Sequence, residues 1–252
     1  MKWRLAIVLL LASTVAAAAQ LPDLGNLIPP GQGSASGRIV QLIALLTVLS
    51  IAPSLLIMVT SFTRFIVALS FLRSGLGLQS TPANLVLISL ALFMTFYVMA
   101  PTFDRAWTTG IQPLMKNEIG EEEAYGRITA PFREFMLTHV REKDLTNFEQ
   151  LADETIRSKT DEKAGEKAAE KQIDLRIIIP AFMISELRRA FEIGFLIMLP
   201  FLVIDMIVAT ITMSMGMMMM PPTVIALPFK TLFFVLIDGW SLVTSGLIRS
   251  FL

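Results

Sequence analysis

The chain has 252 residues, of which 54% are hydrophobic and only 17% are charged, a composition too apolar for an ordinary soluble domain. Lys plus Arg and Asp plus Glu both total 21, so the net charge gives no indication of a nucleic-acid partner, and we expect none. The absence of cysteine excludes disulfides, thiolate metal sites and thiol catalysis. The single histidine, His139, has no second imidazole to help it bind a metal ion, so we expect neither a metal nor a cofactor.

The N-terminal residues have the pattern of a secretory signal peptide. A basic start precedes an apolar core, Leu5–Val15, and small residues then offer a cleavage site after Ala19. We therefore predict a cleavable signal peptide at residues 1–19, which places the mature N-terminus outside the cytoplasm. An uncleaved first membrane helix is the alternative, but the apolar core is short for one. Residues 20–38 are rich in Pro, Gly and Ser and are expected to form a linker.

Four further apolar runs each have about the length that a bilayer-spanning helix needs. We therefore predict an all-α membrane protein with about four long hydrophobic helices in two bent helical hairpins. The first hairpin covers residues 39–103, with a basic loop at 63–82, and the second covers 177–252, with a Met-rich loop at 213–222. Prolines inside the runs are expected to bend or break their helices. The runs lie at about residues 39–62, 83–103, 177–213 and 223–243.

The segment between the two hairpins, residues 104–176, is strongly charged. It carries 16 acidic and 12 basic residues and therefore a net charge of −4. Interleaved Glu and Lys residues are typical of an exposed helix, so we expect a solvated, mostly helical extramembrane segment. With the mature N-terminus outside, the basic loop lies in the cytoplasm, as the positive-inside tendency favours, and the charged segment is extracytoplasmic.

Seven ionisable residues lie inside the third and fourth apolar runs, where a charge is costly unless it is paired or faces protein or water. Arg188 and Glu192 can pair at i,i+4, and Glu186 and Arg189 can pair at i,i+3. The other three need partners elsewhere, so the runs either line a wet path or pack into a protein assembly that shields them from lipid. The seven residues are Glu186, Arg188, Arg189, Glu192, Asp205, Lys230 and Asp238.

The stretch MSMGMMMMPP, residues 213–222, connects the third and fourth runs. Gly216 permits a sharp turn, and Pro221 and Pro222 stiffen the exit from it. Thioether side chains are soft and adaptable, which leaves three readings open: packing between helices, a copper(I) site, and a deformable seal contributed by several chains around a conduit. The residues concerned are Met217, Met218, Met219 and Met220.

Two blocks, Ser61–Pro101 and Ile179–Phe251, together about half of the chain, resemble the FliP/SctR family of type III export-gate proteins. The motifs SELRRAFEIGF, GMMMMPP, ALPFK and DGW occur together and in family order. The signal peptide and the long charged segment are similar to the flagellar branch of that family.

This resemblance implies a non-enzymatic transport subunit of the bacterial inner membrane, located in the flagellar basal body. Such subunits assemble as a ring of five with FliQ-like and FliR-like partners, in contact with membrane lipid. The conical assembly of bent hairpins forms the gate through which unfolded flagellar proteins leave the cytoplasm as passengers. Charges on the third run would then meet neighbouring subunits instead of lipid.

The family's methionine gasket corresponds to Met217, Met218 and Met219, whereas relatives commonly carry another aliphatic residue at Met220. The same likeness suggests that Glu186 and Lys230 pair between adjacent subunits. Four more charges are candidate assembly groups, although a local contact inside one subunit is equally open for each of them: Arg64, Arg73, Asp205 and Asp238.

Two other classes of function stay open from the residues. The Met cluster could serve a small-solute or copper(I) membrane transporter, which metal analysis would reveal. Asp205 and Asp238 could form the catalytic dyad of an intramembrane aspartyl protease, because two close carboxylates can share a proton and activate water. No Gly-x-Gly-Asp element surrounds either residue, and the chain has no Walker-type phosphate loop, so energy for transport would come from partners or an ion gradient.

Overall fold

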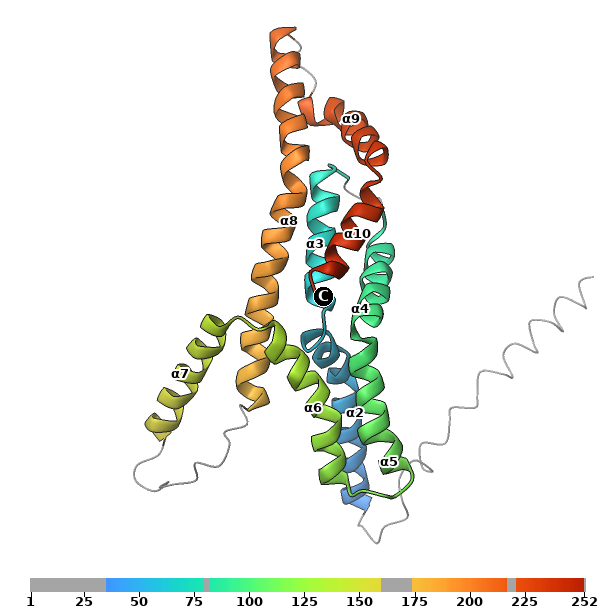
Figure 1. Cartoon of the computed structure of the whole chain (residues 1–252), viewed down its shortest axis with the longest axis vertical. Coiled ribbons are helices and arrows are strands. Elements are labelled where there is room, and N and C mark those ends of the chain that lie inside the picture. Colours follow the sequence, from blue (N-terminus) through green and yellow to red (C-terminus); the bar gives the residue numbers. More distant parts are fainter. Residues whose placement is uncertain (1–34, 79–81, 160–173, 217–220, 252) are drawn as a thin grey trace, which may run out of the picture. The chain divides into compact units, whose positions relative to one another are not determined.

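A computed structural model of the chain describes residues 35–78, 82–159, 174–216 and 221–251 (Figure 1). Within these residues every regular element is a helix, as expected of an all-α protein. The chain divides into two compact units after Ile51. The described part of the first unit is the N-terminal portion of helix α2 (Ala35–Met58). The predicted signal peptide, most of the predicted linker and Met217–Met220 lie outside the described residues.

The second unit contains the end of α2 and all later elements. A π-helical turn, η3, joins α4 directly to the short α5, so that the three form one continuous helical stretch. The elements after α2 are α3 (Phe62–Gly75), α4 (Asn84–Ala106), η3 (Trp107–Ile111), α5 (Gln112–Met115), α6 (Glu121–His139), α7 (Glu142–Lys159), α8 (Leu175–Ser214), α9 (Pro222–Leu236) and α10 (Gly239–Arg249).

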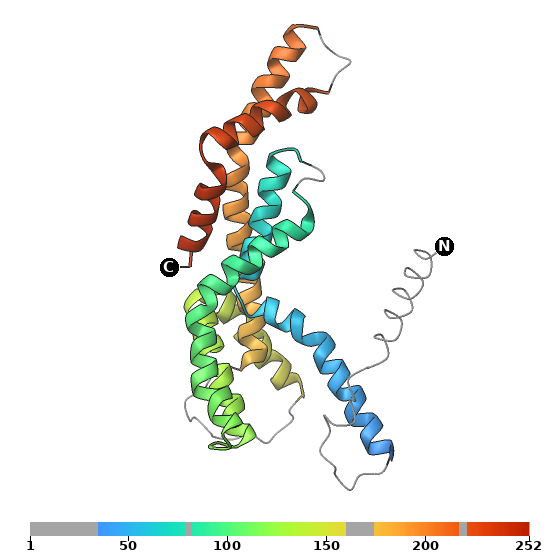
Figure 2. The same cartoon turned by 90° about the vertical axis from the view of Figure 1, so that its right-hand side faces the viewer.

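Helix α3 supplies the centre of the main hydrophobic core. Phe65, Leu69 and Leu72 recur at helical spacing and are fully buried, which defines the apolar stripe of α3. This stripe packs along α8, and α4, α9 and α10 complete the core around it (Figures 1 and 2). A basic loop was predicted at residues 63–82, but residues 62–75 are helical, because the apolar stripe outweighs the two arginines that suggested a loop.

Helix α8 is the longest element. Its 40 residues span about 60 Å, twice the thickness of a hydrocarbon core. Pro180 and Pro200 were expected to bend or break their helix, and both lie inside it without breaking it. Two stretches, Asn84–Met115 and Leu175–Ser214, are long and apolar enough to cross a membrane. The pairs α2 with α3 and α9 with α10 pass the same test if each broken pair counts as one span.

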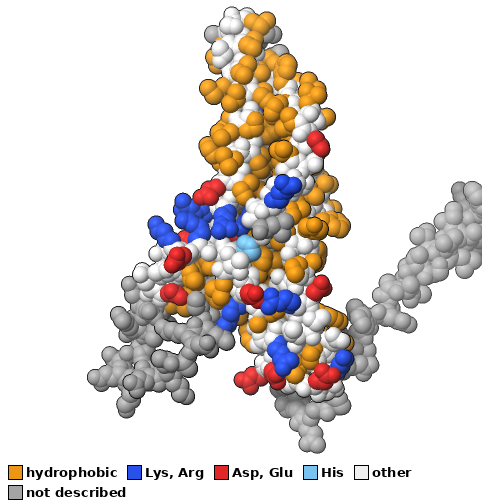
Figure 3. Space-filling model, in the orientation of Figure 1, with side chains coloured by type: hydrophobic (Ala, Val, Ile, Leu, Met, Phe, Trp, Pro, Cys, Tyr) orange, Lys and Arg blue, Asp and Glu red, His pale blue; other side chains and the backbone are white. Residues whose placement is uncertain are grey.

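Within the charged segment, the described residues after α5 form α6 and α7, which pack against the N-terminal half of α8. Three glutamates lie in the first turn of α6, where their negative charges interact favourably with the positive end of the helix dipole. Met136, Ile178 and Phe182 form a second, smaller core between α6 and α8. In Figure 3, charged side chains gather over α6, α7 and the adjoining part of α8, whereas hydrophobic side chains cover the rest of α8 and α9.

An exposed ion pair joins the end of α4 to α6. Arg105 Nη2 donates to Glu134 Oε2 at 2.5 Å. This hydrogen bond, together with the charge of the guanidinium, holds the pKa of Glu134 below its usual range.

The break between α9 and α10 bends the chain by 65° and explains the DGW motif. Asp238 lies in the left-handed region with φ of 50°, which Asp tolerates better than most residues. A Cβ on Gly239 would lie 2.2 Å from the Phe234 ring, so no larger residue fits without movement. Trp240 then packs edge-on against Phe234, with ring centroids 5.3 Å apart.

Candidate functional site

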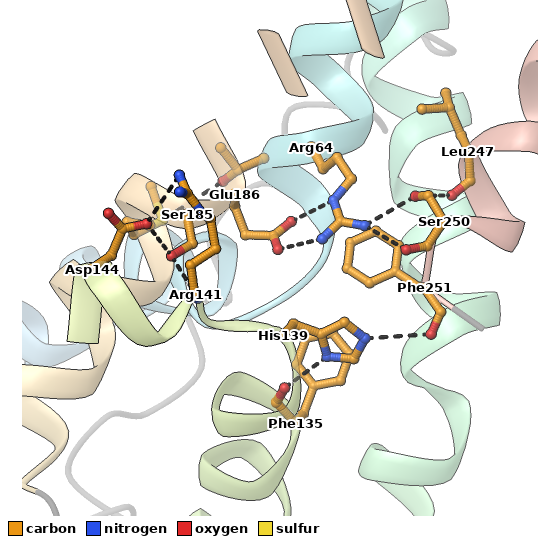
Figure 4. Close-up of polar contacts among 12 residues, drawn as sticks. Arg64, Phe135, His139, Arg141, Asp144, Ser185, Glu186, Leu247, Ser250 and Phe251 are labelled. Carbon is orange, nitrogen blue, oxygen red and sulfur yellow. Dashed lines mark hydrogen bonds and ion pairs between the residues drawn. The ribbon is translucent and has the colours of Figure 1, made fainter. Parts of the chain in front are cut away.

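The most buried charges of the described chain are Arg64 on α3 and Glu186 on α8. Arg64 Nε donates to Glu186 Oε2 at 2.8 Å, and Nη2 donates to Oε1 at 2.5 Å (Figure 4). Their side chains are 1% and 0% exposed. A bidentate pair of this kind fixes both position and orientation, so it sets the register of α3 against α8.

The remaining donors of Arg64 hold the residues that follow α10. Nη1 donates to the carbonyl oxygen of Ser250 at 2.8 Å and to its hydroxyl at 3.0 Å. The guanidinium carbon also lies 3.5 Å from the centre of the Phe251 ring, within the range of a cation–π contact. One arginine therefore ties α3, α8 and the segment after α10 together. Ser250 and Phe251 carry no motif that predicted this contact.

The pair borders a second polar group at the junction of α6, α7 and α8. The Ser185 hydroxyl donates to Asp144 Oδ2 at 2.8 Å and accepts from the Arg141 backbone N–H at 3.1 Å. Arg141 Nη1 lies 3.8 Å from the same Asp144 oxygen. Ser185 precedes Glu186 in SELRR, so this motif anchors α8 to the charged segment on one side and to α3 on the other (Figure 4).

A second buried ion pair connects α8 and α9. Lys230 Nζ donates to Asp205 Oδ2 at 2.6 Å and to the carbonyl oxygen of Gly75 at 2.9 Å. The Lys230 side chain is 6% exposed and that of Asp205 is 30% exposed, although Asp205 Oδ1 itself is buried without a hydrogen-bond partner in the described residues. Lys230 thus links the second hairpin to the end of α3.

These contacts change the expected pairings of the seven intrahelical charges. Glu186 and Lys230 were expected to meet between subunits, yet each has a different partner inside one chain. Neither charge needs a neighbouring subunit for neutralisation, and their pairing across an interface stays a prediction. Glu186 also takes Arg64 instead of Arg189, because a bidentate contact across the core is available to it.

The other candidate charges are placed as follows. Arg188 and Glu192 form the predicted i,i+4 pair at 2.9 Å, and both are 59% exposed. Arg73 donates to the Asn84 side chain at the start of α4. Asp238 is exposed at the α9–α10 break, whereas Asp205 is held by Lys230. Within the described residues the two aspartates share no hydrogen bond, so the structure gives the protease dyad no support.

The described flanks of the Met-rich loop form the tip of the α8–α9 hairpin (Figure 2). Helix α8 ends at Ser214, and Gly216 follows with φ of 74°, a left-handed conformation that glycine adopts without strain. Pro222 is the first residue of α9. Below this tip, α8 and α9 line a partly open apolar pocket of about 520 Å³, with residues such as Val208, Ile211 and Phe229 on its walls.

Comparison with known proteins supports the family resemblance. Residues 45–247 match the model of the FliP family. The chain is 58% identical over 247 residues to the flagellar biosynthetic protein FliP of Rhizobium meliloti (strain 1021), covering 98% of this chain and 97% of that relative. It is 50% identical over 212 residues to the flagellar biosynthetic protein FliP of Bacillus subtilis (strain 168), covering 84% of this chain and 91% of that relative. The extent of the family match and these identities establish that the chain belongs to the FliP family.

Proposed function

We propose that this protein is a membrane-embedded, non-enzymatic component of flagellar biosynthesis and that it forms part of the conduit for unfolded flagellar proteins. Its full-length similarity to proteins named for flagellar biosynthesis supports this role. Its apolar helices support a place in the bacterial inner membrane. In this proposal the charged segment is extracytoplasmic, and several copies, five by family resemblance, assemble with FliQ-like and FliR-like partners.

The observation that carries the proposal is that the described flanks of the Met-rich loop, the end of α8 and the start of α9, form the tip of a hairpin. The tip combines a left-handed turn at Gly216 with a start to α9 at Pro222, where the proline ring fixes φ. Met213 and Met215, the described methionines of the stretch 213–222, are 66% and 67% exposed in the single chain. Adaptable apolar side chains brought together from several copies would close a passage by excluding water, yet yield to an unfolded passenger of any sequence.

The internal ion pairs support an assembly role in a different way. They neutralise the costly charges within one chain and hold α3, α8 and α9 as a unit. The surface left over is largely apolar, with Phe191, Phe195 and Met206 on α8 more than half exposed. Such a surface suits contact with lipid or with neighbouring subunits. The exposed Arg188–Glu192 pair interrupts it, and this pair would be less costly against protein or water than in hydrocarbon.

The seal is tested by deleting Met217–Met219 and measuring ion leak across the membrane of cells that carry the assembled complex. We expect the deletion to make the membrane permeable to ions or small solutes. A matched variant with the same three residues changed to leucine keeps the apolar volume and should stay tight, whereas a triple serine variant should leak. A deletion variant that assembles normally and does not leak would refute the sealing role.

A further inference from the structure

Helix α2 is apolar on every side. No charged residue lies between Arg38, in the first turn of the helix, and Arg64, in the next helix. Successive residues of a helix are rotated by about 100°, so the exposed apolar side chains of α2 point in all directions around its axis. A helix without a polar face is typical of a buried core helix or of a membrane span. The exposed apolar residues include Ile43, Leu46, Leu49, Ile51, Leu55 and Leu56.

The structure excludes the first of these two possibilities for the described part of α2. Residues 35–51 belong to a compact unit whose described residues form this one helix. The turns of a single helix cannot bury one another's side chains, so nothing in the described part of that unit covers them. The boundary with the main core is abrupt, because exposure falls from 39% at Met58 to 4% at Thr60 and 0% at Ser61. Helix α2 is therefore not a core helix.

The length and the hydrogen bonds of α2 suit a hydrocarbon environment. Its 24 residues rise about 36 Å, which exceeds the thickness of about 30 Å of a hydrocarbon core. Two exposed hydroxyl groups bond inside the helix: Thr47 donates to the carbonyl oxygen of Ile43, and Ser50 donates to that of Leu46, each at 2.8 Å. Lipid tails offer no hydrogen-bond partner, so polar groups satisfied within the helix are the ones that can face them.

Helix α3 is not needed to complete this span. The chain bends by 70° between α2 and α3, and the apolar stripe of α3 is buried in the main core. The two helices therefore have different surroundings although they are neighbours in sequence.

We propose that α2 crosses the bilayer alone and contacts lipid hydrocarbon on all of its sides. The inference rests on the proposed membrane location of the protein, and it adds that the partner of α2 is lipid and not another helix. A neighbouring helix, from this chain or from a second copy, would cover one side of α2 and leave the opposite side in lipid. Lipid on every side instead makes all the positions around the helix equivalent. In this arrangement α2 acts as a tether that holds the rest of the chain at the membrane.

Spin labels along α2 test this equivalence in the full chain, reconstituted in vesicles of phosphatidylethanolamine and phosphatidylglycerol. The chain has no cysteine, so each position from 43 to 51 can be changed to cysteine in turn and labelled. The collision rate of each label is measured with oxygen, which concentrates in hydrocarbon, and with a nickel chelate, which stays in water. We expect oxygen to collide more often than the chelate at every position, without a period of about 3.6 residues.

Positions 91–97 of α4 provide the matched control. Ala91 and Met94 are buried there, whereas Phe93 and Tyr97 are exposed, so oxygen collisions should rise and fall with the helical period. The same period in α2 would show that protein covers one of its sides, and more frequent collisions with the chelate would place α2 in water; either result would overturn the inference. Oxygen contact at Phe93 and Tyr97 would then still support the proposed membrane location, whereas its absence there as well would refute that location too.

Discussion

Removing one partner of the Arg64–Glu186 pair should destabilise the fold far more than removing a surface charge. Arg64→Met removes both donors that the structure gives to Glu186, whose side chain is 0% exposed. An uncompensated buried charge typically costs about 3–5 kcal/mol, and we expect Arg64→Met near the upper end of this range. Glu186→Leu should cost about 3 kcal/mol, because Arg64 keeps its two acceptors on Ser250.

The double variant separates loss of the pair from loss of either side chain. With both charges gone, no charge is stranded, so Arg64→Met with Glu186→Leu should cost less than either single change. The free energy of unfolding can be followed by tryptophan fluorescence during titration of the detergent-solubilised chain with a denaturing detergent. Arg188→Met is the matched control, because the Arg188–Glu192 pair lies on the same helix with both side chains 59% exposed. We expect it to change stability by at most about 1 kcal/mol.

Two results would refute this reasoning. Equal effects of Arg64→Met and Arg188→Met would mean that burial does not set the cost. The second result comes from charge reversal. Glu186→Arg should be rescued by Arg64→Glu if the pair inside one chain dominates. If Glu186→Lys is instead rescued by Lys230→Glu, the contact between subunits is the important one.

Three further predictions concern other contacts. Lys230→Met should lower the free energy of unfolding by about 3 kcal/mol, because it leaves the Asp205 carboxylate without its partner, and adding Asp205→Leu should recover much of this loss in the same unfolding titration. A double variant less stable than Lys230→Met alone would contradict the pairing. Gly239→Ala should lower the free energy of unfolding by about 1–3 kcal/mol, because the added Cβ would meet the Phe234 ring. Gly246→Ala on the same helix is the control, since its Cβ would meet nothing within 4 Å. Equal thermal stabilities of the two variants would argue against the close approach. The hydrogen bond and charge of the Arg105 guanidinium lower the pKa of Glu134, so the pair adds a small stability above the ordinary carboxyl pKa, and this stability is lost as the pH falls through the lowered pKa. The difference in free energy of unfolding between Glu134→Gln and the parent should therefore vanish in acid; a difference that persists there would contradict the pair's contribution.

The sequence predicts a helix correctly where the length of an apolar run alone determines the extent of that helix. Helix α8, at Leu175–Ser214, lies close to the apolar run at 177–213. Helix α3 was missed because its two arginines suggested a loop, and the burial of Arg64 depends on a carboxylate 122 residues away. A contact between residues so far apart in sequence leaves no spacing pattern from which it could be predicted. The prediction therefore paired Glu186 with Arg189, its neighbour at i,i+3 on the same helix.

The Asp205–Lys230 pair had a signal that could have revealed it. Asp205 and Lys230 lie at equal distances in sequence from the centre of the Met-rich loop, between residues 217 and 218. In an antiparallel hairpin, residues equidistant from the turn lie at the same level. Opposite charges at matched levels would then be expected to meet, as they do at 2.6 Å. The extra acceptor, Gly75 on α3, belongs to another element and could not be found in this way.

The connection of Arg64 to residues made much later has a consequence for biogenesis. Glu186 follows Arg64 by 122 residues and Ser250 follows it by 186. At about 5–20 residues per second, the guanidinium waits roughly 6–24 seconds for its carboxylate and roughly 9–37 seconds for Ser250 during translation. A permanent positive charge cannot rest in hydrocarbon for that time, so it must stay in water or against the insertion machinery. Helix α3 is therefore synthesised among the first elements but settles among the last.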